Sequence, residues 1–252
     1  MLCLNGWRTT ITIHGTTSQV LAIKRLCLKY ADIFSDTLAR KAARLPPFKI
    51  NIDRKEWECP RNRTAVRLQS VRKEREIKRA IDEMLRSGVI EESDAVYYSH
   101  PVIVQKTAEL YRFCIDYRNL NKCTQASSYP LPNIRALFER IGHQKPTIFG
   151  VMDLTSGYYQ APMDEQSKVL TAFICFYGVY QFTRLPFGPR RAPSYFQEMM
   201  ATIVLNGLMY TMRDVLRRLY RFCPGTGGIP GETRTSLSTF SLFWSAPKSK
   251  EM

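Results

Sequence analysis

Helical and strand patterns follow one another irregularly between residues 71 and 204. Apolar side chains at helical spacing predict helices over 71–87, 131–141 and 193–204. Short strands are expected at residues 102–105, 110–116 and 147–154, and as a hairpin over 171–176 and 180–185. Because this order lacks the regular strand–helix–strand rhythm of a parallel sheet, we predict an α+β fold.

The segments on either side have a different texture. Residues 1–69 read as a leader with one helix at about 18–34, which Ser18 would cap, and one strand at 48–52. Residues 213–252 are rich in Gly, Pro, Ser and Thr and show no period, which is typical of disorder. The expected organisation is therefore a leader over 1–69, a folded region over 70–212 and a tail over 213–252.

The charge balance favours a polyanionic partner. Lys and Arg number 37 against 22 acidic residues, which gives a net charge of +15. Basic side chains that contact phosphates release condensed counterions, so such a chain is suited to nucleic acid. A basic surface that is simply solvated is the alternative, and composition alone does not separate the two.

Cysteine and histidine placement argues against a zinc site or a disulfide framework. The seven cysteines form no C-x-x-C pair and the three histidines are scattered. The first residues lack the apolar core of a signal peptide, and no apolar run is long enough to span a bilayer. We expect a protein with reduced thiols in the cytoplasm or nucleus, not secreted and without a membrane partner.

The stretch 149–160 carries the most chemical information. An apolar strand ends in Asp153, a turn follows, and Tyr158 lies five residues further on. Phosphoryl transfer to a nucleic-acid end requires carboxylates that hold two magnesium ions, and a strand end presents a carboxylate rigidly. A solvated Asp at the end of a buried strand is the alternative, and this segment alone favours it.

The segments around residues 149–160 favour the catalytic interpretation of Asp153, because their motifs occur in a recognisable order. Residues 149–160 resemble the first carboxylate motif of reverse transcriptases, and the surrounding segments resemble those of gypsy-type LTR retrotransposons. The matching segments are 88–91, 99–104, 111–121 and 129–132 before it, and 168–173, 185–188 and 192–197 after it. The resemblance covers about residues 30–212 and implies a fingers-and-palm fragment with an incomplete antiparallel palm sheet.

The resemblance assigns roles by position. Asp153 would be the catalytic carboxylate and a ligand of Mg²⁺, of which the family uses two ions, and Leu154 would offer its carbonyl to the same metal. Tyr158 would lie under the incoming sugar and exclude a 2′-hydroxyl, with Phe187 packed beside the nucleotide. The remaining expected roles are triphosphate binding by Lys106 and Arg112 and template or primer contact by Gln160 and Arg190. The plainer alternatives are a core aromatic for Tyr158 and surface positions for the basic residues.

Three departures from the family pattern stand out. The fingers turn reads Thr-Ala-Glu at 107–109 without a glycine, and the segment after Gly188 reads Pro-Arg-Arg instead of Leu-Lys-Asn. The largest departure is that no adjacent pair of Asp residues follows residue 212, where only the lone Asp214 stands among arginines. Half of the family's metal site is therefore missing.

A shifted reading frame explains the missing pair. When the frame is advanced by one nucleotide from Met212, the codons permit Cys-Glu followed by Tyr-X-Asp-Asp. The two Asp residues then come from the codons of Arg217 and Arg218. The codons of residues 219–222 permit Phe-Ile-Val-Phe. We therefore expect residues from about 213 onward to be an out-of-frame reading; chance agreement of degenerate codons is the alternative.

The expected function follows from these points. The ancestor would be an RNA-directed DNA polymerase that binds template–primer and deoxynucleoside triphosphates and extends a primer 3′ end. The present chain would be inactive, since one carboxylate cannot hold two ions. The alternatives are a non-catalytic nucleic-acid-binding remnant and a pseudogene product without function.

Overall fold

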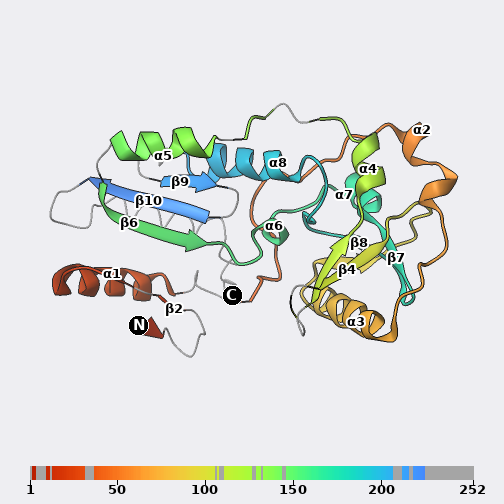
Figure 1. Ribbon diagram of the computed structural model, residues 1–252, viewed down its shortest axis with the longest axis horizontal. Coiled ribbons are helices and arrows are strands. Elements are labelled where there is room, and N and C mark those ends of the chain that lie inside the picture. Colours follow the sequence, from red (N-terminus) through yellow and green to blue (C-terminus); the bar gives the residue numbers. More distant parts are fainter. Residues whose placement is uncertain are drawn as a thin grey trace, which may run out of the picture. The chain divides into compact units, whose positions relative to one another are not determined.

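The computed structural model describes residues 2–3, 10–11, 13–31, 37–105, 107, 111–126, 129–131, 133–143, 146–206, 212–215 and 218–224 (Figure 1). The chain forms two compact units. Unit 1 comprises Met1–Leu45, Pro130–Gly157 and Phe196–Met252, and unit 2 comprises Pro46–Tyr129 and Tyr158–Tyr195. Both contain helices and antiparallel strands, which confirms the expected α+β class. None of the described helices is long and apolar enough to cross a membrane.

The sheet of unit 1 has the strand order β6-β10-β9, with both pairings antiparallel. Its strands are β6 (Pro146–Asp153), β9 (Met212–Val215) and β10 (Arg218–Pro224). Both β9 and β10 lie in or next to the stretch 213–252, whose composition is typical of disorder. The composition of the whole 213–252 stretch hid a β-prone start, and β6 supplies the backbone partner that this start needs.

Local sequence signals determine where α1 begins, whereas packing determines which side chains of α5 are buried. In α1 (Thr17–Lys29) the N-cap is Thr16, not Ser18, because Thr16 and Gln19 form a reciprocal capping box. In α5 (Ile134–His143) Leu137 is buried, but Ile134 and Phe138 are 53% and 56% exposed. The inward stripe predicted for this helix is thus only partly present. The remaining elements of this unit are β1 (Leu2–Cys3), paired with β2 (Thr10–Ile11), and the π-helical turn Met200–Val204, which follows α8 (Ala192–Met199).

Unit 2 contains a two-stranded hairpin and a three-stranded sheet. The hairpin pairs β4 (Pro101–Gln105) with β5 (Tyr111–Ile115), and the sheet has the order β3-β8-β7. Its strands are β3 (Ile90–Glu92), β7 (Phe173–Cys175) and β8 (Gly178–Phe182). The amphipathic helix α3 (Val71–Arg86) lies against β3, β4 and β5 and buries Ile77, Ile81 and Met84 there (Figure 1).

Short helices and bridges complete unit 2. The helices are α2 (Arg54–Trp57), η2 (Pro60–Asn62), α4 (Arg118–Cys123), α6 (Gly157–Gln160), which begins in unit 1, α7 (Glu165–Lys168) and η3 (Val169–Thr171). The strand predicted over 48–52 is reduced to two isolated bridges, Phe48 with Met163 and Ile52 with Thr124. Its partners come from two different segments, so no continuous ladder forms.

A cluster of aromatic rings forms the core between the hairpin and the sheet of unit 2. Phe173 is fully buried, and its ring centroid lies 5.7 Å from that of Phe113, 5.9 Å from Tyr180 and 5.6 Å from Phe182. Such tilted and edge-on ring contacts stabilise the fold beyond what the burial of apolar area alone contributes. The Phe173 ring therefore packs against both the β4–β5 hairpin and strand β8 of the sheet.

His100 anchors the start of the same hairpin. Its ring is 6% exposed, its Nε2 is paired with Thr64 Oγ1 at 2.8 Å, and its carbonyl accepts from the Asp116 N–H at 2.9 Å. Its Nδ1 is buried without a hydrogen-bond partner in the described part of the chain. Burial and the Arg67 charge lower the pKa of His100, while the Asp116 carboxylate opposes the shift. Burial and the Arg67 charge therefore favour the neutral form of the ring.

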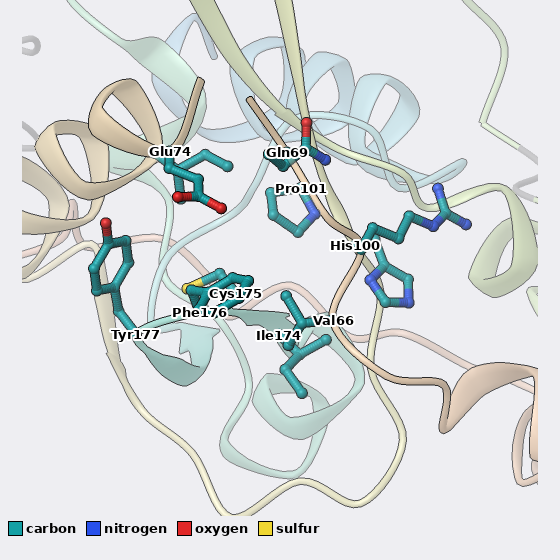
Figure 2. A pocket seen from close by; sticks show the side chains of 11 residues that line it. Val66, Gln69, Glu74, His100, Pro101, Ile174, Cys175, Phe176 and Tyr177 are labelled. Atoms are coloured by element: carbon teal, nitrogen blue, oxygen red, sulfur yellow. The ribbon is translucent and has the colours of Figure 1, made fainter. Parts of the chain in front are cut away.

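His100 also lines a small cavity of about 10 Å³, room for roughly one water molecule. Figure 2 shows its walls, which come from the segment before α3, from α3, from the start of β4 and from β7 with the turn after it. Most of the lining is apolar, including Ile174 and Phe176. We therefore regard the cavity as a packing feature of the hairpin base.

Phe173→Ala should destabilise unit 2 by about 3–5 kcal/mol, because it removes a ring that contacts three others and leaves a cavity. Urea unfolding measures the loss. Phe176→Ala is the matched control, since Phe176 lies three residues away and is 62% exposed. Equal unfolding free energies for the two variants would contradict this description of the core.

His100 should make the fold less stable in mild acid. Its folded pKa lies below the ordinary value of 6.5, so the unfolded chain binds more protons as the pH falls through that value. The melting temperature should drop between about pH 7.5 and about pH 5.5, and less steeply in His100→Gln. The exposed His143 provides the control; a His143→Gln change that flattens the profile as much as His100→Gln does would refute the assignment.

Candidate functional site

Asp153 is the last residue of β6, as the sequence predicts. The chain then turns through Ser156, whose φ of 47° is in the left-handed region that non-glycine residues seldom adopt. A Cβ on Gly157 would lie 3.3 Å from both the Leu154 Cβ and the Phe196 Cζ, so the turn is closely packed. Leu154, the expected carbonyl ligand, is half-buried in this turn.

The strand register shows what faces Asp153 along the backbone. Arg218 occupies the position directly across from it on β10. Asp214 lies on β9, paired with Leu219, so β10 separates it from β6 by two strand spacings, about 10 Å. An arginine therefore stands where a metal site beside Asp153 would require a further acidic residue.

Two magnesium ions would need more carboxylates than the end of β6 supplies. Mg²⁺ prefers oxygen ligands, and two ions need several carboxylates. Asp153 and the Leu154 carbonyl are oxygen donors at this end of β6, and the facing register position holds Arg218, which offers none. Among the residues that the structure describes, no group of three His, Cys, Asp or Glu side chains could hold a metal ion.

Unit 2 carries a stack of aromatic rings that includes two of the expected nucleotide contacts. Tyr158, on α6, is 5% exposed, and its ring stacks on that of Phe187 with centroids 4.9 Å apart and planes 16° apart. Tyr159 meets the same Phe187 edge-on at 5.2 Å and stacks on Phe182 at 6.2 Å. Phe187 itself is 36% exposed. The structure therefore brings Tyr158 and Phe187 together, as a platform with one ring at the surface.

A buried arginine supports this platform, and sequence reasoning missed it. Arg184 is 3% exposed, and its Nη1 donates to the Tyr159 carbonyl at 3.1 Å. Burial lowers the pKa of this guanidinium and raises the pKa of the Tyr159 hydroxyl. A basic residue just before a Leu-Pro turn is the only signal in the sequence, and it is indistinguishable from a surface arginine.

The other expected contacts lie at different places in unit 2. Arg112 is exposed on β5, opposite Val104. Gln160 is half-buried at the end of α6, and Arg190 is exposed in the loop after β8. Lys106 lies outside the described residues.

Residues 104–209 match the protein family described as "Reverse transcriptase (RNA-dependent DNA polymerase)". The matched residues include Arg112, Asp153, Tyr158 and Phe187. The match therefore spans the expected site segments and stops before β9.

Several curated proteins are similar over about half of the chain. The Pol polyprotein of transposon opus from Drosophila melanogaster is 40% identical over 134 residues, which cover 51% of this chain and 13% of that protein. The Tf2-3 polyprotein of Schizosaccharomyces pombe is 36% identical over 124 residues, covering 49% and 9%. The enzymatic polyprotein of Cassava vein mosaic virus is 38% identical over 136 residues, covering 51% and 21%. The chain thus spans a small part of each relative.

Solved structures support the fold. The foamy viral protease–reverse transcriptase in complex with an RNA/DNA hybrid aligns with a TM-score of 0.70 and 18% identity, over 90% of this chain and 29% of that one. A crystal structure of the prototype foamy virus protease–reverse transcriptase gives 0.71 and 22% over the same shares. The expected fold, a partial reverse transcriptase, is confirmed. Residues 104–209 are therefore similar in sequence to the reverse transcriptase domain in the Pol polyproteins of retrotransposons.

Proposed function

We propose that this chain derives from the polymerase of a gypsy-type LTR retrotransposon. Its ancestor would have bound an RNA or DNA template–primer and added deoxynucleotides to the primer 3′ end. The observation that carries the proposal is the stack of Tyr158 on Phe187, together with Asp153 at the end of a strand in an antiparallel sheet. Its place is the cytoplasm or nucleus, where such templates occur.

Each residue takes the role that its place in the fold allows. Tyr158 and Phe187 form the floor for the incoming deoxynucleoside, with Tyr158 excluding a 2′-hydroxyl. Arg112 is exposed and carries a planar charged group suited to a triphosphate. Lys106 joins it in that role, and Gln160 and Arg190 contact template or primer.

Catalysis requires more than the chain supplies. The family generally depends on two metal ions, and in the intact ancestor Mg²⁺ would have been held by Asp153, the Leu154 carbonyl and an Asp-Asp pair. When bound, the ions would stabilise charge on the transferring phosphoryl group. Here Arg218 stands across from Asp153, so we infer that the chain does not polymerise.

The register supports the shifted-frame interpretation. In the shifted frame the codon of Arg218 gives the second Asp of the pair, and position 218 is the one that faces Asp153 across β6 and β10. A hairpin with an Asp at that position would have two carboxylates on neighbouring strands. The backbone therefore retains the arrangement that the lost pair would need.

The genomic nucleotide sequence across residues 210–222 should encode Tyr-X-Asp-Asp when read one nucleotide later. Direct sequencing of the source DNA checks this. A shifted frame that gives no adjacent Asp residues, or that meets a stop codon before Phe222, would rule out the frameshift and leave Arg218 as a native residue of this chain.

A second candidate function is binding of nucleic acid without catalysis, which the net charge of +15 favours. The chain should bind an RNA–DNA hybrid duplex, and its affinity should fall about tenfold for every two phosphates contacted when salt rises from roughly 50 to 200 mM. Fluorescence anisotropy with a labelled hybrid measures this. No binding at low salt would remove both the binding proposal and the template–primer role, and would favour a product without function.

A further inference from the structure

The loop after β8 is held by a single amide side chain from α4. Asn121 Nδ2 donates to the Gly188 carbonyl at 2.9 Å, and the Arg190 backbone N–H donates to Asn121 Oδ1 at 2.7 Å. One side chain thus satisfies a backbone acceptor and a backbone donor two residues apart. This pairing holds the loop as a neighbouring strand would, although residues 188–190 are not part of a strand themselves.

The base of this clamp is rigid. Tyr117, one turn before Asn121, is 2% exposed, its hydroxyl donates to the Thr171 carbonyl at 2.9 Å, and its carbonyl accepts from the Asn121 N–H at 2.8 Å. Gly188 has a φ of 114°, and a Cβ there would lie 3.0 Å from the Tyr117 Cδ2. Only glycine therefore permits the loop to approach Tyr117 so closely.

The clamped loop carries the exposed ring of the platform. Phe187 immediately precedes Gly188, and its ring is the one that stacks on Tyr158. Without the Asn121 side chain, the loop would lose the two hydrogen bonds that hold it next to α4. The ring position would then depend on its contacts with Tyr158 and Tyr159 and on the chain before it.

We propose that Asn121 is a positioning residue that holds Phe187 against Tyr158 and thereby sets the floor under the sugar of an incoming deoxynucleotide. The sugar-selecting part of this role rests on the proposed function, while the clamp itself rests on the two hydrogen bonds. Because Asn121 is half-buried and the loop lies at the surface, its loss should loosen the loop without unfolding unit 2.

Limited trypsin digestion tests the clamp, since Arg190 and Arg191 lie in the loop. Asn121→Ala should be cut at these two sites at least about tenfold faster than the wild type, a change worth about 1.4 kcal/mol in loop opening. Asn119→Ala is the matched control, since Asn119 lies on the same helix and its side chain donates to Asn62 Oδ1 at 2.9 Å, not to the loop after β8. Unchanged cutting at Arg190 and Arg191 in Asn121→Ala would overturn the clamp. Cutting within α3 that is accelerated by the same factor would also overturn it, because that result would indicate general unfolding.

Nucleotide binding tests the sugar-selecting role. The full chain, bound to an RNA–DNA template–primer, is titrated with the deoxy- and the ribonucleoside triphosphate complementary to the template base. The wild type and Asn119→Ala should prefer the deoxynucleotide, and Asn121→Ala should lose at least about threefold of that preference. A retained preference in Asn121→Ala would overturn the role. A wild type that binds neither nucleotide would overturn the sugar-selecting role alone. The trypsin result would still decide on the clamp, and the DNA sequence across residues 210–222 would still decide on the proposed origin of the chain.

Discussion

The antiparallel pairing of β10 with β6 is the constraint on which the polymerase interpretation depends. It fixes position 218 across from Asp153 and places Asp214 one strand further away. Backbone hydrogen bonds set this register, so the geometry survives even where the side chains no longer suit the chemistry. In this register an arginine occupies the position that faces Asp153. The proposed loss of polymerase activity depends on that pairing.

In unit 2 two of the residues expected to contact a nucleotide lie together. Tyr158 and Phe187 are far apart in sequence yet form one stack, and the elements around them are well packed. Arg184 supports the stack through the Tyr159 carbonyl, and Asn121 holds the loop that carries Phe187. These contacts join residues of unit 2 alone. The aromatic stack therefore does not depend on which residue faces Asp153 in unit 1.

Sequence patterns predicted the longer helices and the paired strands β4–β5 and β7–β8 to within a few residues, and missed most of the short elements. Helix α3 follows from its own apolar stripe, and the β4–β5 hairpin from two short strand patterns. The strands β9 and β10 escaped prediction because their stability comes from β6, more than sixty residues earlier. Asn121 escaped for a similar reason, since its two bonds reach a loop 67 and 69 residues away. The placement of Asp153 at a strand end was predicted because strand and carboxylate are adjacent in the chain.

Primer extension measures most directly whether the chain has kept a working metal site. The purified chain is mixed with an RNA template, a DNA primer, all four deoxynucleoside triphosphates and Mg²⁺, and the primer length is followed on a denaturing gel. Loss of the acidic partner of Asp153 predicts that the primer stays at its original length at every Mg²⁺ concentration. Template-directed lengthening that disappears in Asp153→Asn would contradict it, because a polymerase site would then exist without the Asp-Asp pair.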